Sequence, residues 1–159
     1  VSVDGKIEQL KDYPLGDGLL LKPKMGKCAL VKTFPTMDSG IFDYFTKNFD
    51  GIVIEGTGLG HAPTNLGANN LKTYDILRKC IKKGGIVCMT SQCINGRVHP
   101  DVYTNLRRLS RIGVVFCEDI IPETAYIKLA WLMANAKKED VPELMCTNLR
   151  GEINLRHTE

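Results

Sequence analysis

The sequence predicts an α/β domain in three layers, with a four-stranded parallel sheet flanked by helices. Short apolar runs such as residues 52–54 lack the alternation of a half-exposed strand, so helices should cover both of their faces. Segments with apolar residues at helical spacing separate these runs. Strands that alternate with helices are joined by right-handed crossovers and therefore run parallel.

Four segments have the composition of buried strands. The first covers residues 28–31, and the second covers residues 51–55 and ends at a glycine-rich turn. The third covers residues 86–89 and leads into polar residues, and the fourth covers residues 114–117. The pattern leaves the strand order open between 1-2-3-4 and 2-1-3-4.

Helices should follow each strand. Asp38 or Ser39 can cap the first helix and Thr64 or Asn65 the second, while Pro122 suits the first position of the fourth. The third should start near residue 102, and a last short helix should cover residues 142–150. The residues predicted to point inward from the first four helices are Ile41, Tyr44, Phe45 and Phe49; Leu71, Tyr74, Leu77 and Ile81; Leu106, Leu109 and Ile112; and Tyr126, Leu129, Ala130 and Met133.

The chain has 159 residues and 43% apolar content, enough for one well-buried core. Residues 1–26 are rich in Gly, Pro and Lys and should form an interdomain linker with a remnant hairpin, while residues 27–159 should form the domain. The chain does not start with methionine, and its first residues read as the continuation of a longer sequence. We therefore expect a fragment or a processed chain.

The charge balance is modest, with 21 basic and 18 acidic residues and a formal charge of +3. This balance argues against a dedicated nucleic-acid surface, which usually shows a larger basic excess. The basic residues that gather in the second and third predicted helices are most simply explained as solvated helix faces, with RNA contact as the alternative. They are Lys79, Lys82, Lys83, Arg107, Arg108 and Arg111.

The six cysteines do not form a Cys-x-x-Cys pair, and several lie within the apolar strand segments. We therefore expect reduced thiols and a cytoplasmic location. No apolar run reaches the roughly 18 residues that a membrane span needs.

A glycine-rich turn follows the second strand and comprises Gly56, Thr57, Gly58, Leu59, Gly60 and His61. It resembles a dinucleotide-binding loop, but the final glycine is replaced by His61 and no acidic residue ends a third strand about 20 positions on. No Gly-Lys-Ser/Thr sequence follows for a phosphate loop. The turn should lie at the carboxyl end of the sheet, where open α/β sheets present ligand or partner surfaces.

A second polar group follows the third strand and comprises Thr90, Ser91, Gln92 and Cys93. These residues can either present hydroxyls and an amide to a ligand or bond the local backbone, and both interpretations stay open. Cys93 is a nucleophile only if a base such as His61 lies beside it. His61, His99 and His157 lack metal-ligand spacing, so no metal site is predicted.

Several motifs together resemble the carboxyl-terminal domain of the asparaginase/glutaminase family, in particular the D-type subunits of archaeal glutamyl-tRNA(Gln) amidotransferases. The resemblance covers nearly the whole chain. The matching segments are residues 51–63, 90–93, 96–98, 118–119, 122–125 and 128–131, together with Tyr103.

The resemblance implies a parent protein that hydrolyses glutamine and supplies ammonia for converting Glu-tRNA(Gln) to Gln-tRNA(Gln). The family's nucleophilic threonine, Thr-Asp pair and lysine lie in an amino-terminal domain, and this chain matches none of those motifs. We therefore predict no catalytic residue here and an inactive isolated domain. The candidate residues near the active site or interface are those of the glycine turn, residues 56–61, and residues 90–93. Of these, Thr90, Gln92 and Cys93 match a region near a regulatory amino-acid site in cytosolic asparaginases.

The expected partners are the chain's own amino-terminal catalytic domain, a second copy in a homodimer, the E-type subunit of the amidotransferase and, through the complex, tRNA(Gln). No cofactor is expected in this domain, whereas the E-type subunit should use ATP and magnesium. The alternative is a stand-alone α/β module that binds a small regulatory ligand.

Overall fold

The structure is a computed structural model that describes residues 2–3, 6–7 and 24–154, so most of the predicted linker lies outside the described residues. The strands β1 (Ser2–Val3) and β2 (Lys6–Ile7) pair antiparallel. The main sheet has four parallel strands in sequential order, which confirms the predicted fold class and selects the first of the two strand orders. They are β3 (Cys28–Lys32), β4 (Gly51–Gly56), β5 (Ile86–Ser91) and β6 (Val115–Phe116).

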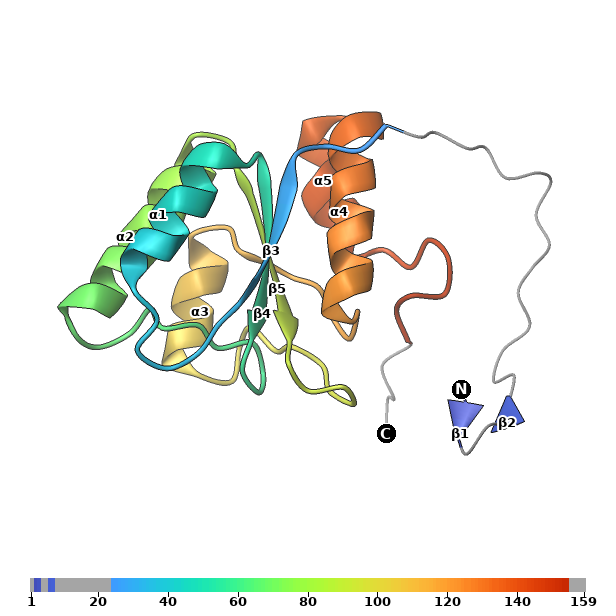
Figure 1. Cartoon of the computed structure of the whole chain (residues 1–159), viewed down its shortest axis with the longest axis horizontal. Helices are drawn as coiled ribbons and strands as arrows, with labels where there is room; N and C mark the ends of the chain where they lie inside the picture. The colour runs from blue at the N-terminus through green and yellow to red at the C-terminus, as the bar shows by residue number, and fades with distance from the viewer. Residues whose placement is uncertain (1, 4–5, 8–23, 155–159) are drawn as a thin grey trace.

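Helices cover both faces of the main sheet. Figure 1 shows α1 (Ser39–Asn48), α2 (Ala68–Lys82) and α3 (Thr104–Arg111) on one face, and α4 (Pro122–Asn135) and α5 (Val141–Cys146) on the other. A short 3-10 helix, η1 (Lys138–Asp140), connects α4 to α5. This arrangement explains the absence of alternation in the strand segments, because both sides of each central strand are buried.

The core has one cluster on each face of the sheet. Ile52 and Ile54 of β4 point toward α1, α2 and α3, where they meet fully buried residues such as Leu77. Val53 points the other way, toward Leu129 of α4. Burial of each such side chain stabilises the fold by about 1.5–3 kcal/mol.

Two helices present different faces from those predicted. In α1 the fully buried residue is Phe42, whereas Tyr44 is 59% exposed. In α2 Thr73 and Leu77 are buried, whereas Leu71 is 47% exposed. The prediction was wrong at Tyr44 and Leu71 because large apolar residues lie on two sides of each helix, and only packing selects one side.

The predicted start of α4 at Pro122 is confirmed, and so is Asp38 as the cap of α1, where its Oδ1 accepts a hydrogen bond from Gly40 N–H at 2.6 Å. The predicted start of α2 at Thr64 or Asn65 is wrong, since the N-cap is Gly67 with φ of 93°.

Thr64 is instead fully buried and donates to Asn105 Oδ1 at 3.0 Å. The end predicted for the last helix at residue 150 is also wrong, because α5 stops at Cys146. β5 extends through Thr90 and Ser91, two residues beyond its predicted end.

Candidate functional site at the carboxyl edge of the sheet

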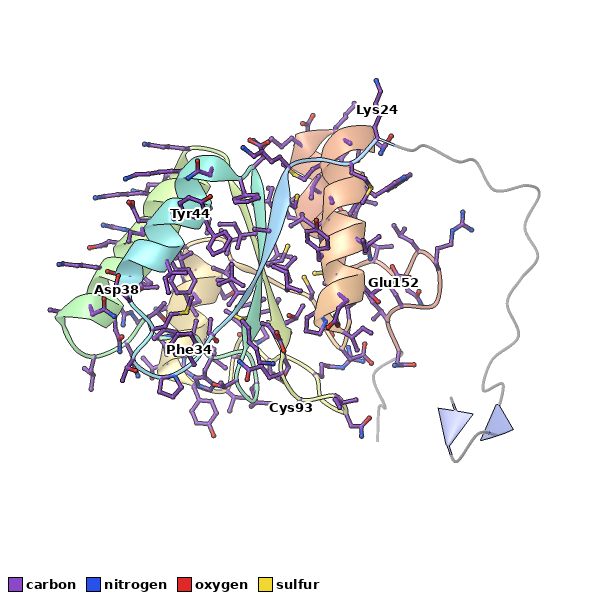
Figure 2. All side chains as sticks on the ribbon, in the orientation of Figure 1. Lys24, Phe34, Asp38, Tyr44, Cys93 and Glu152 are labelled. Carbon is purple, nitrogen blue, oxygen red and sulfur yellow. The ribbon has the colours of Figure 1, made fainter. Side chains whose placement is uncertain are left out.

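The candidate residues gather at one end of the sheet because β3, β4 and β5 are parallel and in register. Lys32, Glu55 and Thr90 lie side by side, and Gly56 is paired with Ser91. Figure 2 shows Phe34 and Cys93, which follow β3 and β5, at this same end of the molecule. The structure thus brings the glycine turn and residues 90–93 together, as predicted for parallel strands.

The glycine turn is closed by its own backbone. The N–H of Thr57 donates to the carbonyl of His61 at 2.9 Å, and the N–H of His61 donates to the carbonyl of Thr57 at 2.8 Å. Gly58 and Gly60 have φ of 53° and 103°, which disfavour a side chain. At Gly60 an added Cβ would also lie 2.9 Å from Met89 Cγ, so the turn is packed against the core.

The polar side chains at the end of β5 and just after it bond the neighbouring backbone. Thr90 Oγ1 donates to the carbonyl of Ile54 at 3.1 Å, and Ser91 Oγ donates to the carbonyl of Gly58 at 2.5 Å. Gln92 Nε2 donates to the carbonyls of Thr33 at 2.6 Å and Glu55 at 3.1 Å. Of the two interpretations left open by the sequence, the geometry favours the local one for these three donors.

Thr33 belongs to the same network, although the sequence did not single it out. It is 2% exposed, and its Oγ1 donates to the carbonyl of Glu55 at 3.0 Å. Its position just past β3 corresponds to that of the polar residues at the end of β5, and this correspondence is the signal that could have revealed it. The Glu55 carboxylate accepts a hydrogen bond from Lys32 Nζ at 2.7 Å. Lys32 and Glu55 are the only charged residues of β3 and β4, and their charges neutralise each other.

The thiol of Cys93 and the imidazole of His61 have separate surroundings. Cys93 is exposed, and its N–H donates to Ser91 Oγ at 3.0 Å. The ring of His61 lies 5.0 Å from that of Tyr103, measured between centroids. Neither side chain is a hydrogen-bond partner of the other among residues 24–154, so the geometry does not support a cysteine–histidine pair.

A cavity of about 330 Å³ opens beside the glycine turn. Its lining includes Thr57 and His61 from the turn and the amide side chains of Asn65, Asn70 and Asn105. These amides and hydroxyls are neutral, which suits a small polar ligand better than a strongly charged one. A larger cavity of about 820 Å³ lies around Arg97, Asp119 and Glu152, on the side of α4.

Among the residues that the structure describes, no group of three or more His, Cys, Asp or Glu side chains is placed to hold a metal ion. Within the same residues, no helix combines the length and the apolar composition needed to cross a membrane. All six cysteines are free, and Cys28, Cys88 and Cys117 are buried, as their strand positions predict.

The fold and this edge define a parallel α/β domain whose carboxyl-end loops are hydrogen-bonded to the neighbouring strands. A family model described as "Glutaminase/Asparaginase C-terminal domain" matches residues 27–145, and the chain belongs to this family.

Curated relatives agree with this assignment. The chain is 42% identical over 155 residues to the D-type subunit of glutamyl-tRNA(Gln) amidotransferase from Pyrococcus abyssi, covering 96% of this chain and 30% of the relative. It is 41% identical to the corresponding amidotransferase subunit from Pyrococcus furiosus, covering 94% of this chain and 34% of the relative. The chain therefore spans about a third of the length of these relatives.

Solved structures share the fold. The thermostable L-asparaginase from Thermococcus kodakarensis superposes with a TM-score of 0.80 at 23% identity, covering 98% of this chain and 47% of that one. L-asparaginase I from Vibrio cholerae gives a TM-score of 0.71 at 26% identity, covering 82% of this chain and 38% of that one.

Proposed function

We propose that this chain is the supporting domain of a glutaminase subunit whose parent releases ammonia from glutamine to convert Glu-tRNA(Gln) to Gln-tRNA(Gln). The domain contributes no catalytic residue. It packs against an amino-terminal catalytic domain and presents the loops at the carboxyl edge of its sheet to the neighbouring active site. This role requires the edge to be rigid, because displacing groups that position a substrate by about 1 Å lowers the reaction rate by a large factor.

The observation that carries this proposal is the use of the edge hydroxyls as donors to backbone carbonyls. Thr90 and Ser91 hold strand and turn together, and no basic side chain accepts their protons. A hydroxyl attacks an amide only when an adjacent base removes its proton. Both hydroxyls therefore suit a structural role better than a nucleophilic one.

Exposed apolar side chains at the same edge support the proposal that a partner covers this surface. Each strand of the main sheet is followed by at least one of them, and the most exposed are Leu66 at 85% and Ile94 at 86%. Large apolar residues that gather at one end of a domain mark an interaction site. We assign this end to contact with the catalytic domain and with a second copy in a homodimer. The other residues concerned are Phe34, Val102, Tyr103 and Ile121.

The names of the relatives describe one subunit of an amidotransferase, which supports a complex with further subunits. We propose that the partner in this complex is an E-type subunit, which binds ATP and magnesium and handles tRNA(Gln) in the cytoplasm. The domain itself needs none of these small molecules for its supporting role.

An ammonia-release assay tests the proposal. The 159-residue chain, incubated alone with glutamine or asparagine, should release no ammonia above buffer. Added to the separately produced amino-terminal part of one of the amidotransferase relatives, it should restore glutamine hydrolysis. Turnover by the chain alone, or no gain on mixing with a folded partner, would contradict the proposed role.

A second candidate function is a binding module for a small regulatory ligand, and the neutral polar cavity at Asn65, Asn70 and Asn105 favours it. Calorimetric titration of the chain with glutamine, aspartate and a nucleotide separates the two. Saturable binding that is lost in Asn105→Leu would favour the module, while absence of heat for all three ligands favours the supporting domain.

A further inference from the structure

The surface of α2 and α3 carries a band of cations that the supporting role does not use. We call it the basic strip, and its members come from the last two turns of α2 and from α3. Lys79, Lys82 and Arg111 are exposed. The strip comprises Arg78, Lys79, Lys82, Arg108 and Arg111.

Two contacts show that these residues form one surface. The guanidinium of Arg108 lies over the ring of Tyr74, 4.4 Å from its centroid, so this side of α2 faces α3. Arg78 and Lys82 follow Tyr74 at four-residue steps and lie along the same side of the helix. Just after α3, Gly113 lies so close to α2 that a Cβ added to it would be 3.0 Å from Ile81 Cγ2. The end of α3 is therefore beside α2.

The helices that carry the strip have a much larger positive charge than the net charge of the whole chain suggests. Residues 68–83 and 104–111 hold eight basic residues and one acidic residue, Asp75, out of 21 basic and 18 acidic in the chain. The remainder therefore has 13 basic and 17 acidic residues, so these two helical segments are formally +7 and the rest of the chain is −4. Asp75 pairs with Arg78 at 2.9 Å, and the exposed Lys79, Lys82 and Arg111 have no ion-pair partner among the described residues.

Helix ends do not explain the strip by themselves. Cations in a last turn complement the helix dipole, and this applies to four of the five strip residues, Lys79, Lys82, Arg108 and Arg111. However, α4 has 14 residues and no basic residue in its last turn, so the fold does not require such cations. Arg78 also lies before the last turn of α2, where the effect of the dipole has faded.

We propose that the basic strip binds the phosphodiester backbone of RNA. Arg and Lys spread over two neighbouring helices match a line of phosphates, and they confer affinity without reading a base sequence. The choice of RNA as partner rests on the proposed function, in which the parent acts on an aminoacylated tRNA. The strip lies on the α1–α2–α3 face of the sheet, and Figure 2 shows nitrogen-tipped side chains projecting outward from the α1–α2 side. This face is distinct from the carboxyl edge, so both surfaces can be occupied together.

Fluorescence anisotropy tests this directly. Labelled unfractionated tRNA is titrated with the 159-residue chain at salt concentrations from about 50 to 200 mM. The double variant Lys82→Gln/Arg111→Gln should bind about tenfold more weakly at the lower salt, and its salt slope should fall by about two. Lys79→Gln should weaken binding in the same direction without touching α3.

The matched control is Lys24→Gln/Lys137→Gln, which removes the same charge at the end of α4, where Asn135 Nδ2 donates to the carbonyl of Lys24. This control should keep the affinity of the unaltered chain within about twofold. An equal loss in the control, or no loss in Lys82→Gln/Arg111→Gln with its thermal unfolding unchanged, overturns the proposal.

Polyglutamate serves as a competitor of tRNA that imitates an acidic protein partner. If it displaces the chain from tRNA at equal charge concentration, the strip recognises acidic polypeptides and the RNA proposal fails. The anisotropy measurement needs no amide hydrolysis. If the chain fails to restore glutamine hydrolysis on mixing but still binds RNA, the proposed function alone is rejected. If it restores hydrolysis but does not bind RNA, only the RNA site is rejected.

Discussion

Lys128 Nζ of α4 lies 2.7 Å from Glu152 Oε1 in the segment after α5, and their side chains are only 7% and 11% exposed. The same ammonium donates to the carbonyls of Met145 at 3.3 Å and Thr147 at 2.5 Å. Glu152 in turn accepts from the N–H groups of Leu149 and Arg150. This ion pair therefore fastens the final described segment onto α4, on the side of the sheet opposite the basic strip.

Loss of the ammonium should destabilise the domain strongly. In Lys128→Met the Glu152 carboxylate stays buried without its cation, and we expect a cost of about 3–5 kcal/mol in the free energy of unfolding. Urea titration followed by circular dichroism measures it. The double variant Lys128→Met/Glu152→Gln removes the unpaired charge and should be more stable than Lys128→Met. A double variant that is less stable would contradict a direct ion-pair role.

The ion pair also predicts the response to acid. Burial by itself would raise the pKa of Glu152, but the hydrogen bond from Lys128 and the backbone N–H groups outweigh it and lower the pKa from 4.5 to about 2. A lowered folded pKa gives stability that is present above about pH 5 and is lost as the pH falls toward 2. The full contribution is about 3 kcal/mol.

Unfolding free energies measured between about pH 6 and pH 2 should therefore fall more steeply for the unaltered chain than for Glu152→Gln. Other carboxylates contribute equally to both proteins and cancel in the comparison. Parallel curves for the two proteins would show that Glu152 does not carry the acid sensitivity.

The glycine turn offers a matched pair of substitutions. Gly60→Ala combines φ of 103° with a Cβ placed 2.9 Å from Met89 Cγ and 3.1 Å from Val98 Cγ1, and should cost about 2–4 kcal/mol. Gly58→Ala has φ of 53° and no atom within 4 Å, so only the backbone penalty of about 1 kcal/mol applies. Thermal unfolding of both variants measures the difference. Equal losses would mean that Gly60 does not pack closely in solution.

Thiol chemistry should separate Cys93 from Cys146, although both are exposed, because the pKa of Cys146 is raised. Burial above all, with a smaller effect of Asp50, raises the pKa of Cys28 to about 11, and burial likewise raises the pKa of Cys146 to about 11. At pH 8 only about a thousandth of either is thiolate, the reactive form. The exposed Cys93 should thus account for the fast phase with a disulfide reagent in the native protein. Cys93→Ser should remove that phase, whereas Cys146→Ser should leave it, and a fast phase that survives in Cys93→Ser would contradict this assignment.

Much of the fold could be predicted because its signals are local. Unbroken apolar runs mark the doubly covered strands, and Asp38 and Pro122 mark helix starts through backbone chemistry that involves only near neighbours. The inward faces of α1 and α2 were harder, since Phe42 and Tyr44 are both aromatic and differ only in what they meet after folding. The candidate residues do lie together at the carboxyl end of the sheet, but the hydrogen-bond partners of their hydroxyls depended on distances between strands.

The sequence by itself determined the class of fold, the edge of the sheet at which the candidate loops gather, and the family, because strand composition, turn glycines and motif order are properties of adjacent residues. The tertiary structure alone decided the order of the strands, the partners of Thr90 to Gln92, the buried pairing of Lys128 with Glu152 and the gathering of cations on α2 and α3. Each of these features joins residues that are far apart in the chain or lie on separate elements. The net charge of +3 does not indicate which face of the domain carries the positive charge.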